Sequence, residues 1–197
     1  MTCRPVSTAA EAAKTSEESA KLMMALFMGS WSLGFVALFA AHLYLRLDAV
    51  SWPPAGAPPP PRVLTGVATA LALLSSGAYH WGLRGIERGE RRTLTRGLAL
   101  ATLLTFLFVL TQVAGGAQAV ARGLTWEAGV YGAFFWIVGG FHLAHVMVGF
   151  VAGAWLSARA AGGAFTADGH LAVRMWGYYW HTIGAVWAVI YVLVFLT

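Results

Sequence analysis

Residues 131–156 read YGAFFWIVGGFHLAHVMVGFVAGAWL and contain no charged side chain. A helix crosses the hydrocarbon layer of a membrane, roughly 30 Å thick, with about 20 apolar residues. This stretch therefore predicts a transmembrane helix over Tyr131–Leu156. Two histidines within it, His142 and His145, share one helix face because they are three residues apart.

Four other stretches of the chain are similarly long and apolar: Leu22–Leu45, Val63–Leu83, Gly97–Ala121 and Trp176–Leu196. The connection over residues 48–61 holds six of the seven prolines and is expected to be an extended strap. No segment alternates apolar and polar residues for long enough to favour a membrane β-barrel. The sequence predicts an all-α integral membrane bundle of five helices over residues 21–197, preceded by a polar, cytoplasmic N-terminal tail over residues 1–20.

The composition supports this class. Hydrophobic residues make up 58% of the chain and charged residues 11%, whereas soluble domains carry about 25% charged residues. The basic residues lie between apolar runs and form no continuous patch, so the net charge of +5 indicates membrane topology and not nucleic-acid binding. The single cysteine, Cys3, can form neither an internal disulfide nor a cysteine-rich metal site.

The distribution of basic residues predicts the orientation, because cytoplasmic loops are enriched in Lys and Arg. If the N-terminus is cytoplasmic, three basic residues lie outside: Arg46, Arg62 and Arg122. The cytoplasmic side then holds ten: Arg4, Lys14, Lys21, Arg84, Arg88, Arg91, Arg92, Arg96, Arg159 and Arg174. The sequence therefore predicts a cytoplasmic N-terminus and a C-terminus on the opposite side.

Aromatic and small residues suggest how the helices are anchored and packed. Four rings fall at the cytoplasmic end of the last span and are expected to anchor it at the membrane interface: Trp176, Tyr178, Tyr179 and Trp180. Two pairs of small residues, four positions apart, are expected to serve helix packing: Gly149 with Gly153, and Gly66 with Ala70.

The spans contain no Asp, Glu or Lys, so the side chains in them that can become charged near neutral pH are five histidines: His42, His80, His142, His145 and His181. The absence of a charge at mid-depth disfavours an autonomous transporter. Imidazoles can hold haem or a metal between helices, but a pair on one helix cannot provide both axial ligands of one haem. A haem would need one histidine from each of two helices, such as His80 with His181. The other hypothesis, which we favour, is that these rings contact neighbouring helices or lipids and that the chain itself binds no metal.

Three motifs resemble a known family. Gly140-Phe-His-Leu-Ala-His-Val-Met-Val-Gly149 is similar to the G-F-H-x-x-H-V-x-x-G signature of subunit III of haem-copper cytochrome c oxidases. Tyr179-Trp180-His181 with Val186-Trp187 resembles the last helix of that family, and Ser75-Ser76 with His80-Trp81 resembles an earlier one. Many bacterial members have a short form of five helices, which agrees with the number of spans predicted here.

The resemblance implies a non-catalytic subunit that contains neither haem nor copper, both of which belong to partner subunits. It further implies contacts with catalytic subunit I, with other oxidase subunits and with bound phospholipids. Seven residues would then make lipid or interhelix contacts and would not act as catalytic groups or metal ligands: His80, Trp81, His142, His145, Trp180, His181 and Trp187.

Three acidic positions of the family pattern are absent from this chain. Where members often read F-x-x-S-E, Phe27-Met-Gly-Ser30 is followed by Trp31. The motif Q-x-x-E reads Gln112-Val-Ala-Gly115, and the acidic residue expected near Gly184 is missing. These departures argue against a carboxylate-based proton role and predict a divergent branch or an unusual assembly.

The sequence thus predicts an accessory subunit of a bacterial respiratory terminal oxidase, in the inner membrane, that stabilises the catalytic subunit and binds lipids. That complex would reduce oxygen and pump protons. One alternative keeps the fold and changes the complex, to the related accessory subunit of a nitric oxide reductase. Another, from a different class, is an autonomous haem-b membrane protein.

Overall fold

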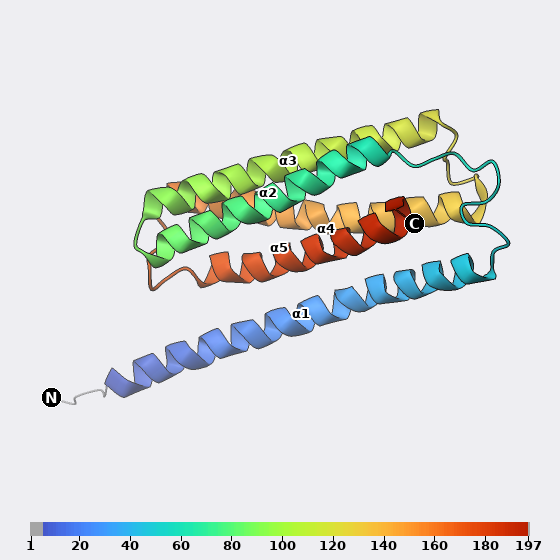
Figure 1. The fold of residues 1–197 in the computed structure, drawn as a ribbon. Helices are drawn as coiled ribbons and strands as arrows, with labels where there is room; N and C mark the ends of the chain where they lie inside the picture. The colour runs from blue at the N-terminus through green and yellow to red at the C-terminus, as the bar shows by residue number, and fades with distance from the viewer. Residues whose placement is uncertain (1–5, 197) are drawn as a thin grey trace.

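The computed structural model describes residues 6–196, which form five long helices and contain no strand (Figure 1). The helices are α1 (Val6–Asp48), α2 (Arg62–Glu87), α3 (Arg91–Ala121), α4 (Gly129–Ala161) and α5 (Leu171–Ile190), and a π-helical turn, η1 (Tyr191–Leu196), follows α5. All five helices are long and apolar enough to cross a membrane. The predicted fold class, an all-α bundle of five membrane-spanning helices, is confirmed. Cys3 lies outside the described residues.

The helices extend beyond the predicted spans, most of all at the start of α1. This helix begins at Val6 and not at Leu22, so that most of the predicted polar tail is helical. The segment is rich in alanine, glutamate and lysine, which favour helix, and the Glu17 carboxylate lies 2.7 Å from the Lys21 ammonium one turn later. Hydropathy detects the part of a helix that lies in lipid and does not detect a polar extension.

Helices α2 to α5 form a bundle in which α2 and α3 make the closest pair. A Cβ atom placed on Gly97 of α3 would lie 2.5 Å from the Cα of Gly82 on α2, so the two backbones touch at this point. The turn between them is short because Gly89 takes a left-handed φ of 80°, and the Glu90 N–H donates to the Gly85 carbonyl at 2.9 Å. The small residues that allow close approach are thus Gly82 and Gly97, a pair that the sequence analysis did not single out.

Helix α1 lies along the outside of the bundle and packs against α5 and α4 (Figure 1). Most of its side chains are exposed, while Phe35 and His42 are each 1% exposed. The His42 Nε2 lies 3.2 Å from the Leu193 carbonyl oxygen, which ties α1 to the end of the chain. Residues 49–61 form a non-helical strap, but it is not extended throughout as predicted, because the Ala57 N–H donates to the Pro54 carbonyl at 2.9 Å and closes a turn. The Trp52 ring of the strap packs edge-on against both His42 and Tyr131.

Because successive helices run in opposite directions, the charged residues collect at the two ends of the bundle (Figure 1). One end holds Arg46, Arg62 and Arg122. The other end, here named the basic end, holds the turn between α2 and α3, the end of α4, the start of α5 and most of the basic residues. Which end faces the cytoplasm stays a prediction.

Candidate lipid and interhelix contact site

The seven predicted residues lie on three helices: His80 and Trp81 on α2, His142 and His145 on α4, and Trp180, His181 and Trp187 on α5. They do not converge on one point. The structure instead distributes them over several contacts along α5 and its neighbours.

His142 and Trp187 form the central contact of the bundle. Their rings stack with centroids 5.1 Å apart, and the two side chains are 1% and 2% exposed. The Trp187 Nε1 donates a hydrogen bond of 3.1 Å to the Thr69 hydroxyl of α2, and the ring packs edge-on against Phe108 of α3. This one contact therefore joins all four helices of the bundle.

His80 and His181 form a second contact, nearer the basic end. The two imidazoles stack with centroids 4.6 Å apart and an interplanar angle of 18°, which joins α2 to α5. The Tyr79 ring lies edge-on to His181 at 5.3 Å, and the Tyr79 hydroxyl donates to the Val173 carbonyl of α5 at 3.2 Å. His80 is exposed at the bundle surface, whereas His181 is half-buried.

His145 makes one of the contacts between α4 and α1. Its ring stacks on Trp31 with centroids 4.8 Å apart, and its Nδ1 lies 2.7 Å from the Phe141 carbonyl of its own helix. The Tyr179 hydroxyl of α5 donates to the His145 carbonyl at 3.0 Å. A tryptophan thus makes a ring contact at the position where the family pattern has an acidic residue.

Trp180 belongs to an aromatic cluster that corrects one prediction. The rings of Trp176 and Trp180 stack at 5.5 Å, and the Trp176 Nε1 donates to the Gly149 carbonyl at 2.9 Å. Three of the four rings expected at the membrane interface, Trp176, Tyr179 and Trp180, are buried, and Tyr178 alone is exposed, at 49%.

The physical reason for this burial lies on α4. Gly149 and Gly153 lack side chains and leave room that the rings of Trp176, Tyr179 and Trp180 fill. The pair therefore serves helix packing, as predicted, but its partner is an aromatic side chain and not a helix backbone.

Comparison with known proteins identifies the chain. The family model of cytochrome c oxidase subunit III matches residues 6–197, which include all of these contacts. The chain belongs to the cytochrome c oxidase subunit III family. This confirms the resemblance seen in the three motifs.

Among the relatives is cytochrome c oxidase subunit 3 of Oncorhynchus mykiss, 31% identical over 178 residues that cover 87% of this chain and 67% of the relative. The corresponding protein of Carassius auratus is 32% identical with the same coverage. A cyanobacterial subunit 3, from Synechocystis sp., is 28% identical over 174 residues that cover 87% of this chain and 72% of the relative.

Trp81, which belongs to the subunit III motif with His80, lies at the surface of the bundle. It is 46% exposed, and within residues 6–196 it makes no hydrogen bond or ring contact with another helix. Its position is suited to contact with lipid or with another protein, and its predicted role stays a prediction.

Hydroxyl groups join the helices of this subunit III at places that the sequence analysis missed. The Ser75 hydroxyl of α2 donates to the Ala101 carbonyl of α3 at 3.0 Å. The Thr102 and Ser157 hydroxyls lie 3.1 Å apart between α3 and α4, and the Thr95 hydroxyl donates to the Ala160 carbonyl at 3.1 Å. The sequence does contain a signal for these contacts, since Ser and Thr residues within apolar spans commonly form hydrogen bonds between helices.

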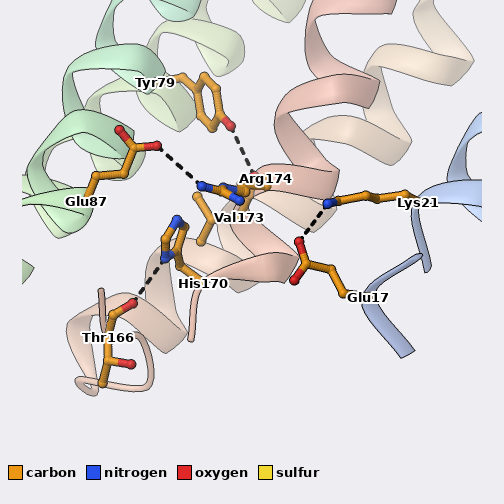
Figure 2. Close-up of polar contacts among 8 residues, drawn as sticks. All are labelled: Glu17, Lys21, Tyr79, Glu87, Thr166, His170, Val173 and Arg174. Carbon is orange, nitrogen blue, oxygen red and sulfur yellow. Dashed lines mark hydrogen bonds and ion pairs between the residues drawn. The ribbon is translucent and has the colours of Figure 1, made fainter. Parts of the chain in front are cut away.

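The basic end carries exposed ion pairs (Figure 2). The Arg174 guanidinium of α5 lies 3.8 Å from the Glu87 carboxylate of α2, and each side chain is about two-fifths exposed. Figure 2 shows Arg174 pointing toward Glu87, with the Glu17–Lys21 pair of α1 near the start of α5. In the turn between α2 and α3, hydrogen bonds from the Thr93 hydroxyl and from Arg88 hold the pKa of Glu90 below its usual range.

An apolar groove lies between α1, α4 and α5 on the side of the basic end. Its volume is about 290 Å³, and its walls come from Met24 and Phe27 of α1, Val148, Ala152, Trp155 and Leu156 of α4, and Ala172, Met175, Trp176 and Tyr179 of α5. The side chains that line this groove are apolar or aromatic.

Proposed function

We propose that this chain is the non-catalytic subunit III of a bacterial respiratory terminal oxidase, in which it packs against catalytic subunit I and other subunits of the complex. The observation that carries the proposal is the family match over residues 6–197. The complex would reduce oxygen to water and pump protons, with haem and copper held by the partner subunits. This chain would have a structural role and would stabilise the catalytic subunit.

The contacts of the histidines support a structural role. His142, His145 and His181 each stack against a ring from another helix. Such contacts stabilise a bundle in lipid. The burial of apolar surface between helices contributes little there, so close packing and hydrogen bonds determine which helices associate.

The apolar groove supports the proposed binding of phospholipid. A fatty acyl chain would lie in the groove between α1, α4 and α5, and its phosphate would lie at the basic end near Lys21 and Arg174. Native mass spectrometry of the assembly would reveal retained phospholipid, and loss of that lipid on replacing Met175 by tryptophan would place it in this groove.

The proposed orientation has the N-terminus in the cytoplasm of a bacterial cell and the C-terminus on the other side of the inner membrane. The concentration of arginine at the basic end supports it. A cysteine introduced at Asp168, in a Cys3→Ser background, would react with a membrane-impermeant maleimide in inverted vesicles but not in intact spheroplasts. The reverse pattern would overturn the orientation.

Affinity purification from the native membrane tests the complex. With a tag on this chain, we expect a haem-copper catalytic subunit and a copper-containing subunit to co-purify, whereas a nitric oxide reductase would bring no copper-containing subunit. A Soret absorption band that stays with the isolated chain would instead favour the haem-b protein. A tag on an unrelated membrane protein from the same cells provides the control.

A further inference from the structure

His142 is the most deeply buried imidazole for which the structure provides no hydrogen bond. It is 1% exposed, and neither Nδ1 nor Nε2 has a partner among the described residues. A neutral imidazole has one N–H donor and one acceptor nitrogen, so one unsatisfied donor remains in either tautomer. Its stacked neighbour Trp187 cannot supply the partner, because the indole N–H already donates to Thr69.

A small cavity adjoins this ring where α2, α3, α4 and α5 meet. Its volume is about 20 Å³, and a single water needs roughly 10–15 Å³. His142 contributes to its wall together with two hydroxyl residues, Ser76 of α2 and Thr105 of α3, and the rest of the wall is apolar or aromatic. The cavity is therefore large enough for one water, with the two to four polar neighbours that a buried water requires.

The hydrogen bonds around the cavity leave capacity for that water. The Thr105 hydroxyl donates to the Ala101 carbonyl at 2.8 Å. The Ser75 hydroxyl lies 3.0 Å from the same carbonyl and 3.3 Å from the Thr105 oxygen, so it occupies at most one of the two lone pairs of that oxygen. The Thr105 oxygen can still accept a hydrogen bond, and the Ser76 hydroxyl can donate or accept. A water that accepts from the His142 N–H and donates to the Thr105 oxygen would give that N–H its missing acceptor.

We propose that this cavity binds one water molecule, which joins His142 of α4 to Thr105 of α3 and Ser76 of α2. The site goes beyond the proposed membership of an oxidase, because it depends only on residues of this chain. It extends the Ser75–Ala101–Thr105 hydrogen bonds, which join α2 to α3, across the bundle to α4. The water takes the place of a direct hydrogen bond, which His142 does not make to any described residue.

A double-mutant cycle on the full chain, purified with its lipids, tests the water. Thr105→Val and His142→Phe should each lower the Tm by about 2–6 °C, because each removes a partner of the water. In the His142→Phe background, Thr105→Val should lower the Tm by less than half as much as in the natural chain. An equal loss in both backgrounds would overturn the proposal.

Two controls separate the hydroxyl group from simple packing. Thr105→Ser keeps the hydroxyl, so its effect should be the same in both backgrounds, and coupling of Thr105→Ser to His142→Phe would assign the coupling to packing and overturn the proposal. Thr111→Val removes a hydroxyl that donates only within its own helix, to the Leu107 and Phe108 carbonyls, so it should lower the Tm by the same amount with and without His142→Phe.

If His142→Phe does not fold, Ser76→Ala takes its place in the cycle. A smaller effect of Thr105→Val in the Ser76→Ala background would then support the water, and an equal effect in both backgrounds would overturn the proposal.

A cryo-EM map of the assembled complex, at a resolution that shows other buried waters, gives a second readout. We expect one density peak within hydrogen-bond distance of His142 and the Thr105 hydroxyl. A map in which this cavity is empty while other internal waters are visible would contradict the proposal.

Discussion

Helix α1 and the bundle of α2 to α5 are both transmembrane by composition, but they are held in the structure by different means. In the most apolar part of α1, 6% of the residues are buried, against 28–33% in the corresponding parts of the other four helices. The bundle is built on backbone contact at Gly82 and Gly97 and on a continuous hydrophobic core of aliphatic and aromatic side chains. Helix α1 depends on a few ring contacts, made by Trp31, Phe35 and His42.

The difference indicates that α2 to α5 are packed more closely against one another than α1 is packed against them. Exposed apolar residues cover most of α1, which suits a helix that lipids or another protein surround. The two regions should therefore respond differently to substitution.

The largest effect is expected where the bundle helices touch. Gly97→Leu would drive a side chain into the backbone of α2 at Gly82, and we expect a loss of about 3 kcal/mol or more in the free energy of unfolding. Gly77→Leu is the matched control, since a Cβ atom there meets nothing within 4 Å. Thermal unfolding followed by circular dichroism measures both, and equal Tm values for the two variants would refute the backbone contact.

A smaller and more local effect is expected at the attachment of α1. His42→Ala removes the hydrogen bond to the Leu193 carbonyl and the stack on Phe134, at a cost of about 1–3 kcal/mol in the docking of α1. The Tm of the bundle should change little, because His42 lies outside the α2–α5 core.

Spin labels measure that docking directly. Labels at Gly29 of α1 and Gly77 of α2, both in open space, would report a broader distance distribution in His42→Ala than in the natural chain, with Cys3 replaced by serine throughout. Tyr44→Ala, at a site 68% exposed, is the control. An unchanged distribution in His42→Ala would show that the other ring contacts suffice.

The smallest effect is expected in the turn between α2 and α3, outside the membrane spans. The pKa of Glu90 is lowered in the folded chain, so its ionised form stabilises the turn above its unfolded pKa and this contribution is lost as the pH falls through the folded pKa. Glu90→Gln should therefore lower the Tm slightly at pH 7 and not at all at low pH. A Tm difference that grows toward low pH would contradict this.

Hydropathy and motifs predicted much of the molecule, namely the five spans, the family and the helix on which each histidine lies. They could not predict which way each helix turns about its axis, and this rotation decides every interhelix contact. The stacking of His80 on His181 depends on that rotation, and so does the backbone contact between Gly82 and Gly97. The same limit explains why Trp176, Tyr179 and Trp180 were expected at the interface, since a ring at the end of a span can face lipid or the core.

The ring contacts of α1 extend from His42, near the strap, back to Phe27, which stacks on Tyr179 of α5. Glu17 lies ten residues before Phe27, which corresponds to about 15 Å of helix toward the basic end. A bend of about 10° at Phe27 would then move the helix near Glu17 sideways by about 3 Å. The direction of the first turns of α1 can therefore adjust to the molecules that lie beside them.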